Sequence, residues 1–80
     1  MNNVYIMKST TNYRFKYLEG TSGILQYDDS YNVYWFNNFH TSSIVSKLDE
    51  DGLLTLRTLN SVYEFKKENN TIKYTLLEAI

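Results

Sequence analysis

The second half of the sequence consists of short β-prone segments separated by turn signals. Residues 41–48, 53–58 and 61–66 are rich in β-branched, leucine and aromatic side chains, which favour strands. The acidic run 49–52 separates the first two segments, and its glycine can supply the positive φ that a hairpin turn requires. A polar stretch at 58–61 predicts the second turn. The pattern therefore predicts three short strands folded back on one another as a meander.

The first half of the sequence adds further expected strands. Residues 13–17 alternate aromatic and basic side chains with a period of two, which predicts a half-buried strand. We expect other strands at residues 4–9, 24–27, 31–36 and 71–80, a turn at 28–30 and a connection at 37–40 with room for one helical turn. The tail could also end in a helical turn, although its alternating apolar residues favour a strand.

Turn signals that recur at roughly 8–12-residue spacing are typical of small barrels and sandwiches. The expected fold is all-β, a small antiparallel barrel or sandwich of about six or seven short strands, with a meander-like C-terminal half. Residues 1–80 are expected to form a single β domain, because 80 residues suffice for one domain only.

The composition limits how such a small domain can be stabilised. A chain of this size buries roughly 60% of the surface that its unfolded form exposes, and small domains often depend on disulfides, metals or oligomerisation. The sequence has no cysteine and one histidine, so we expect no disulfide, no metal site and no cofactor. An aromatic core can replace these supports, since 16% of the residues are aromatic. A homodimer remains the alternative.

The charge of the chain bears on its partners and on its location. The formal net charge is −1 and neither half is basic, so nucleic acid is a disfavoured partner, because binding phosphates requires clustered lysine and arginine. The N-terminal segment lacks the charged start and long apolar run of a signal peptide. No window approaches the roughly 18 apolar residues of a membrane span. We therefore expect a cytoplasmic protein without membrane contact.

Catalytic motifs are weak in this sequence. His40 precedes Thr41, Ser42 and Ser43, which formally offers a serine–histidine pair, but a triad needs residues from separate elements that converge on a pocket. We interpret residues 41–43 as the start of the next strand. The acidic run 49–52 does not continue as a calcium-binding EF-hand, because its twelfth position is Asn60 and its flanks are β-prone. We therefore expect a protein that is not an enzyme.

Aromatic side chains near the middle of the chain are the best candidates for a binding site. The candidate protein-binding residues are Tyr31, Tyr34, Trp35, Phe36 and Phe39, together with the acidic residues Asp28, Asp29, Asp49, Glu50 and Asp51. On a strand, Tyr31 and Trp35 point to one side while Tyr34 and Phe36 point to the other. The strand is therefore either buried on both sides or exposes one aromatic face, and exposed tyrosine and tryptophan are typical of binding hot spots.

The charged side chains also fit roles other than protein binding. The acidic groups lie in expected turns, where aspartate is favoured because it hydrogen-bonds the local backbone. In the segment 13–17, Tyr13 and Phe15 alternate with Arg14 and Lys16, and such a surface can stack single-stranded bases. A small nucleic-acid-binding β-barrel is therefore one alternative function. A phage structural or assembly component, held together by exposed strand edges, is another.

The meander resembles a group of known proteins. Residues 41–44, then Gly52 with Leu53 and Leu54, then residues 58–63 resemble small uncharacterised β-rich proteins of phages and mobile elements of Gram-positive bacteria. The resemblance covers about a third of the chain. It implies a phage-encoded, non-enzymatic protein-binding module that inhibits a bacterial defence or host protein. Its acidic loops would then imitate phosphates toward a basic partner site.

Overall fold

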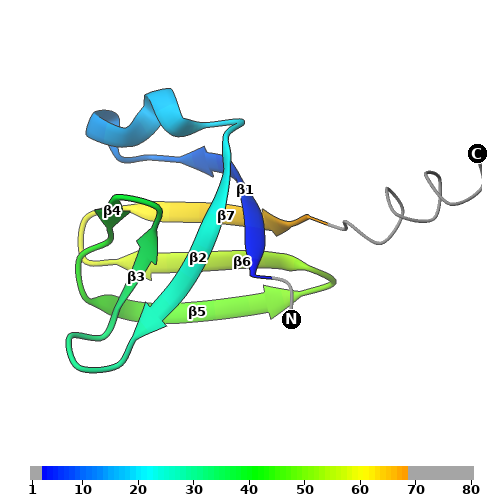
Figure 1. Ribbon diagram of the computed structural model, residues 1–80. Coiled ribbons are helices and arrows are strands. Elements are labelled where there is room, and N and C mark those ends of the chain that lie inside the picture. The colour runs from blue at the N-terminus through cyan, green and yellow to red at the C-terminus, as the bar shows by residue number, and fades with distance from the viewer. Residues whose placement is uncertain (1–2, 69–80) are drawn as a thin grey trace, which may run out of the picture.

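Seven strands and one short 3₁₀ helix make up the part of the chain that the structure describes, residues 3–68 of a computed structural model (Figure 1). In chain order they are β1 (Val4–Thr10), η1 (Tyr13–Leu18), β2 (Ser22–Asp28), β3 (Val33–Phe36), β4 (Phe39–His40), β5 (Ile44–Glu50), β6 (Leu53–Thr58) and β7 (Val62–Lys67). The predicted all-β class is confirmed. The strand predicted at 71–80 lies outside the described residues.

All the strand pairs are antiparallel and belong to one sheet in the order β4-β3-β2-β1-β7-β6-β5. The chain builds the sheet as two meanders, β1 to β4 and β5 to β7, which join where β1 pairs with β7. The order ends at β4 and β5, so the sheet does not close into a barrel. Instead, β2 and β3 cross over β5, β6 and β7, and the two halves face each other like a sandwich (Figure 1).

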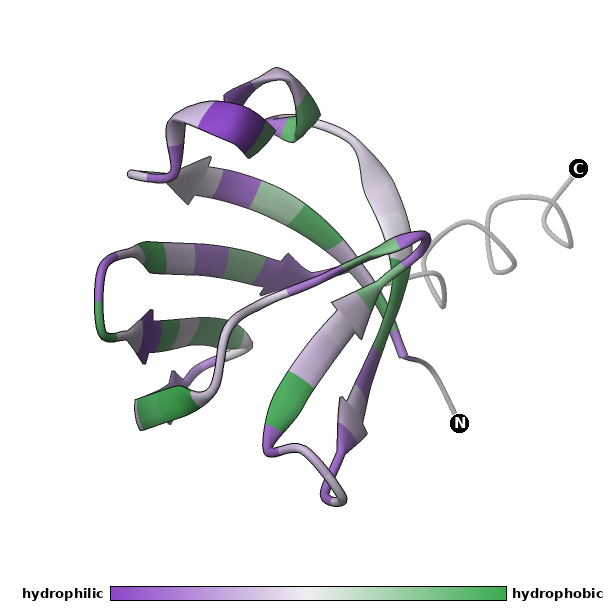
Figure 2. Cartoon of the chain, turned by 90° about the vertical axis from the view of Figure 1, so that its left-hand side faces the viewer, coloured by the Kyte–Doolittle hydropathy of each residue, from purple (hydrophilic) through white to green (hydrophobic). Residues whose placement is uncertain are grey.

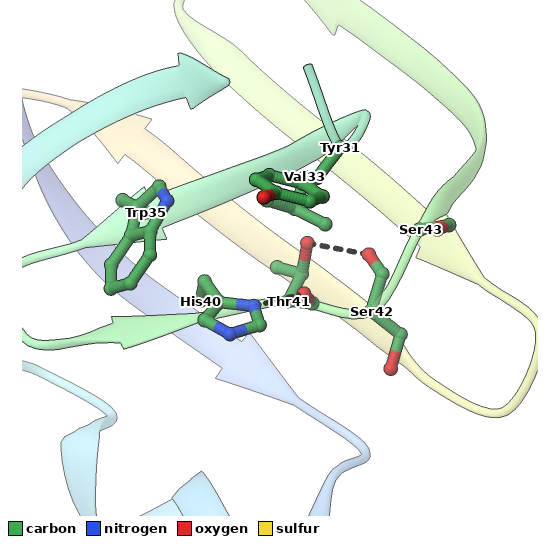
Figure 3. A pocket seen from close by; sticks show the side chains of 7 residues that line it. All are labelled: Tyr31, Val33, Trp35, His40, Thr41, Ser42 and Ser43. Carbon is green, nitrogen blue, oxygen red and sulfur yellow. Dashed lines mark hydrogen bonds between the residues drawn. The ribbon is translucent and has the colours of Figure 1, made fainter. Parts of the chain in front are cut away.

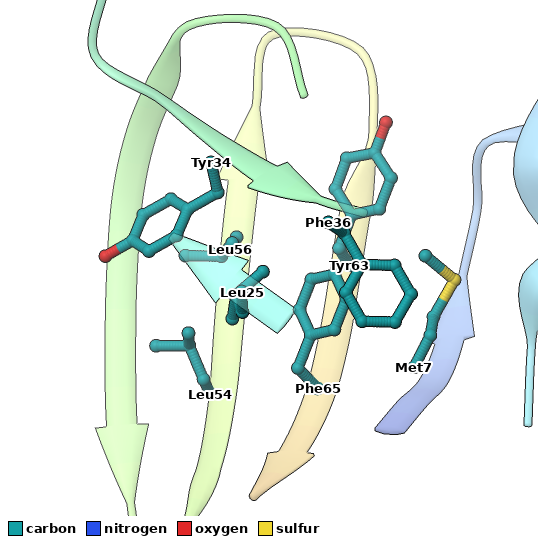
Figure 4. Close-up of a cluster of buried hydrophobic side chains, with 8 residues drawn as sticks. All are labelled: Met7, Leu25, Tyr34, Phe36, Leu54, Leu56, Tyr63 and Phe65. Carbon is teal, nitrogen blue, oxygen red and sulfur yellow. The ribbon is translucent and has the colours of Figure 1, made fainter. Parts of the chain in front are cut away.

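One core fills the space between the two halves of the sheet. Hydrophobic and hydrophilic residues alternate along the strands (Figure 2), as expected when one face of each strand is buried. The core side chains come from β1, β2, β3, β6 and β7 (Figure 4): Met7, Leu25, Tyr34, Phe36, Leu54, Leu56, Tyr63 and Phe65. The rings of Phe36 and Phe65 lie 5.0 Å apart and connect the two meanders.

The hairpin between β5 and β6 has the turn that the sequence predicts. Asp51 and Gly52 both have positive φ, 53° and 80°, as a type I′ turn requires at its two central positions. Glu50 is directly opposite Leu53, so the turn contains only Asp51 and Gly52. Asp49 and Glu50, predicted to lie in the loop, are instead the last residues of β5.

The strand predicted at 13–17 is wrong, because this segment forms η1. Asn12 caps the helix: its side-chain oxygen accepts a hydrogen bond from the Arg14 N–H at 3.0 Å, and its carbonyl accepts one from Phe15 at 3.1 Å. Tyr13 and Tyr17 are among the most exposed aromatic residues of the segment 3–68, whereas Phe15 packs against Phe39. The alternation of aromatic and basic residues therefore did not reflect a buried face.

The connection expected at 37–40 also differs, because its second half forms the short strand β4. Asn37 adopts a left-handed conformation with φ 56°, which asparagine tolerates, and reverses the chain. Phe36 then pairs with Phe39, and Trp35 pairs with His40. Within residues 3–68, no helix is long and apolar enough to cross a membrane.

Candidate functional site

Strand β3 separates its aromatic residues onto two faces. Tyr34 and Phe36 point into the core, with exposed fractions of 8% and 1%. Trp35 points outward and is 39% exposed, and Tyr31, in the turn before β3, is 73% exposed. The strand therefore buries one aromatic face and leaves the other accessible, which resolves the two alternatives that the sequence leaves open.

The accessible face forms a hollow of about 430 Å³ (Figure 3). The residues that line it are Tyr31, Val33, Trp35, His40, Thr41, Ser42 and Ser43. The pairing of β3 with β4 places His40 directly opposite Trp35, with ring centroids 4.7 Å apart. Val33 is buried although it lies on the outer side of β3, and it forms an apolar part of the hollow. We call these seven residues the aromatic hollow.

Hydrogen bonds fix the floor of the aromatic hollow. Thr41 is fully buried: its N–H donates to the Tyr34 carbonyl at 2.9 Å, and its hydroxyl accepts from the Tyr34 N–H at 3.2 Å. The same hydroxyl donates to the Ser42 carbonyl at 2.7 Å. The backbone from β4 to Ser42 is therefore attached to β3 before any partner binds, which limits the conformational entropy lost on binding.

His40 has a defined orientation in this site. Its Nδ1 lies 2.7 Å from the Thr41 carbonyl oxygen, which can only accept, so Nδ1 carries the hydrogen. Within residues 3–68 no serine hydroxyl hydrogen-bonds to His40, although Ser42 and Ser43 lie in the same hollow. The histidine therefore presents an oriented ring edge beside Trp35, and the arrangement suits the recognition of an apolar or aromatic group.

The predicted aromatic set is only partly brought together by the fold. Tyr31 and Trp35 share the aromatic hollow, whereas Tyr34 and Phe36 belong to the core. Phe39 is half-buried and faces the other way, with its ring 3.9 Å from Phe15 and 5.7 Å from Tyr63. The sequence did not predict His40 or residues 41–43 as part of the binding surface. A prediction of a two-residue turn at 37–38 would have led us to expect His40 opposite Trp35.

The predicted acidic residues form two separate groups. Asp28 and Asp29 lie where β2 ends, and the Asp28 carboxylate accepts a hydrogen bond from the Ser30 N–H at 3.0 Å, as in a local turn. The group Asp49, Glu50 and Asp51 lies at the far end of β5. Seven strand residues span roughly 20 Å, so the two groups do not form a single acidic surface. Asp28 lies directly opposite Val33 of the aromatic hollow, and Asp29 follows it in the turn that leads to Tyr31.

The exposed residues of η1 form a different surface. Tyr13 and Tyr17 are 89% and 75% exposed. Lys16 forms an ion pair with Glu19 at 3.2 Å, and the Arg14 guanidinium lies 5.9 Å from the centre of the Phe15 ring. Each of the two basic groups expected to contact nucleic acid thus has a neighbour within the domain, although both are exposed.

Metal-binding groups do not converge in the described part of the chain. No cluster of three or more histidine, cysteine, aspartate or glutamate side chains there is placed to hold a metal ion.

Comparisons of the chain with protein-family models, curated proteins and solved structures found no match.

Proposed function

We propose that the protein is a non-enzymatic protein-binding module that contacts its partner through the aromatic hollow. The observation that carries this proposal is the pair of exposed rings, Tyr31 and Trp35, beside an apolar hollow with a hydrogen-bonded floor. Tyrosine and tryptophan are enriched among residues that dominate binding energy, especially where they surround a preformed pocket. Asp28 and Asp29 extend this surface with negative charge, which suits a partner with a basic rim.

The proposed partner is a bacterial host protein, and the proposed action is inhibition by covering a functional surface of a defence or host enzyme. The support for this choice is the resemblance of the meander to small phage proteins, together with an exposed aromatic face on a domain of only 80 residues. Such a partner would meet the chain in the host cytoplasm, the compartment that the sequence predicts. Asp49, Glu50 and Asp51 form a second acidic group at the far end of β5, apart from the hollow.

Affinity capture from bacterial lysate with matched variants tests this proposal. Wild-type protein is expected to enrich one host protein, and Trp35→Ala is expected to lose it. A hot-spot tryptophan contributes at least about 2 kcal/mol, which corresponds to roughly thirtyfold weaker binding. Tyr17→Ala is the control, because it removes an exposed aromatic ring on η1 and should leave capture unchanged.

The two variants also distinguish the remaining alternatives. Equal capture by Trp35→Ala and wild type would contradict the proposed surface. Loss of binding by Tyr17→Ala alone, with enrichment of nucleic acid, would favour the η1 surface and the nucleic-acid alternative. Purified partner and variants should then be compared by calorimetry, after circular dichroism has established that each variant is folded.

A further inference from the structure

Strand β5 is an exposed edge of the sheet. Among residues 3–68, it pairs only with β6, on one side, and it lies at the end of the strand order (Figure 1). Its side chains are exposed from Val45 to Glu50, including the apolar Val45 and Leu48 at 63% and 55%. A strand edge of this kind carries backbone donors and acceptors that can pair with a further strand.

The start of β5 is already covered. The Ile44 N–H donates to the Asn32 carbonyl at 2.9 Å, and the Ile44 carbonyl accepts from the Asn32 side-chain amide at 2.9 Å. The register shifts between Ile44 and Ser46, so Val45 forms an irregular step in the strand. The edge that is open to pairing therefore begins after this step, at Ser46.

The hairpin turn determines which backbone groups of β5 point outward. In a hairpin with two turn residues, the residues that flank the turn form a hydrogen-bonded pair, and pairs then alternate along the ladder. Glu50 flanks this turn, so Glu50, Leu48 and Ser46 direct their backbone groups to β6. Lys47 and Asp49 direct theirs to the free edge. Ile44, beyond the irregular step, points outward too, in agreement with its bonds to Asn32.

Charge then selects one register for pairing with a second copy. A residue whose backbone groups point to the free edge pairs with a residue of the same kind on the second strand. A symmetric antiparallel pair of β5 strands can therefore place Lys47 opposite Lys47, Asp49 opposite Asp49, or Lys47 opposite Asp49. The first two registers bring like charges together, which is unfavourable directly across a ladder. The third forms two lysine–aspartate pairs and places the two Leu48 side chains opposite each other on the other face.

We propose that the free edge of β5 pairs with β5 of a second copy of this chain, in the antiparallel register that places Lys47 opposite Asp49 of the other copy. The twofold axis passes beside Leu48, and each lysine–aspartate position exchanges two backbone hydrogen bonds. A C2 dimer uses the same patch on both subunits, so a self-complementary strand is the property that it requires. The two seven-stranded sheets become one continuous sheet, and the aromatic hollow of each copy stays outside the β5 contact.

The side chains that would form the pairs reach the surface of the domain. Lys47 and Asp49 are both exposed, and they lie on the same side of β5, opposite Leu56 and Leu54 of β6. The Lys47 ammonium lies 5.9 Å from the centre of the Tyr34 ring and interacts with the Tyr34 side chain. Within residues 3–68 it has no salt bridge. Asp49 follows Lys47 by two residues along the open edge. A second β5 strand that runs in the opposite direction presents the same two residues in reverse order, so each Lys47 can face an Asp49 of the other copy.

Charge-reversal variants of the full chain test the proposed register. Sedimentation velocity over a range of concentrations is expected to show a dimer for wild type. Lys47→Asp and Asp49→Lys are each expected to weaken dimerisation about tenfold or more, because each replaces two opposite-charge pairs by two like-charge pairs. An equimolar mixture of the two variants is expected to restore the dimer as a heterodimer, because each lysine-bearing edge then faces an aspartate-bearing edge. Lys8→Asp, at an exposed position of β1, controls for net charge.

The equimolar mixture of the two variants tests the register even where one variant is less stable. Wild type that remains a monomer at all concentrations would overturn the proposal, and this is also the result expected if a segment of the same chain covers β5. Single variants that dimerise as well as wild type would overturn it too. Monomeric variants, shown to be folded by circular dichroism, that do not combine in the mixture would overturn the register.

Discussion

Gly23 shows how one residue in a strand can be required by a neighbouring side chain. The Asn37 amide lies over the Gly23 backbone, and its oxygen accepts a hydrogen bond from the Ile24 N–H at 3.1 Å. A Cβ at position 23 would come within 2.7 Å of the Asn37 Cγ, so Asn37 would have to move away. We expect Gly23→Ala to lower the free energy of unfolding by about 1 kcal/mol, the net contribution of one such hydrogen bond. Urea denaturation measures this loss.

A second substitution separates this contact from other effects of alanine. Asn37→Gly preserves the left-handed backbone at φ 56° and removes the side chain that alanine would displace. In that background, Gly23→Ala is expected to cost much less than in the wild type. Strictly additive losses in the double variant would contradict a role for this contact, because additivity is the behaviour of residues that do not interact.

At the scale of elements, one carboxylate contributes to the attachment of η1 to β1. The pKa of Glu19 is held below its ordinary value, chiefly because the Thr10 N–H donates to the carboxylate at 3.0 Å, and also because Lys16 is 3.2 Å away. A lowered pKa in the folded state stabilises the protein above the pKa of the unfolded chain. That stabilisation is lost as the pH falls through the folded pKa.

Glu19→Gln is therefore expected to lower the free energy of unfolding at neutral pH, and the difference from wild type should disappear in acid. Urea denaturation at a series of pH values measures the difference. Glu50→Gln removes an exposed carboxylate of β5 and controls for the change in net charge. A difference between wild type and Glu19→Gln that stays constant with pH would show that the Glu19 charge does not hold η1 in place.

The elements that the sequence predicts well are those with local causes. The strands β5, β6 and β7 lie close to their predicted ranges, because Asp51 and Gly52 specify a turn whatever the rest of the chain does. The two-residue strand β4 could not be predicted, since it exists through its pairing with β3. The helix η1 was missed because its period-two pattern suggested a strand, although Asn12 supplies a capping signal directly before it.

The candidate site, like the strands, could be predicted only where its causes are local. The period of two in β3 correctly separates Trp35 from Tyr34 and Phe36, but it does not tell which side faces the core. That is decided by the other meander, which covers Tyr34 and Phe36 with β6 and β7 (Figure 4). His40 joins the site through strand pairing, and Thr41 through its hydrogen bonds to Tyr34, contacts that are not encoded in any single segment.

At the scale of the whole molecule, the two meanders depend on each other through the aromatic core. Phe36 of β3 is 1% exposed, and its ring lies 5.0 Å from that of Phe65 of β7. β1 and β7 join the two halves along one side, whereas Phe36 reaches across the core between them. Removing this ring leaves a cavity where the halves meet, so the loss should affect the folding of the entire domain.

We therefore expect neighbouring residues of β3 to differ sharply when each is replaced by alanine. Phe36→Ala should cost about 3–5 kcal/mol, the usual loss for a buried phenylalanine, and a domain of this size has a total stability of only about 4–12 kcal/mol. Trp35→Ala, on the partly exposed outer face, should cost about 1 kcal/mol. Urea denaturation followed by circular dichroism measures both losses. Comparable losses would mean that Trp35 also supports the fold, and the binding test would then need Tyr31→Ala in its place.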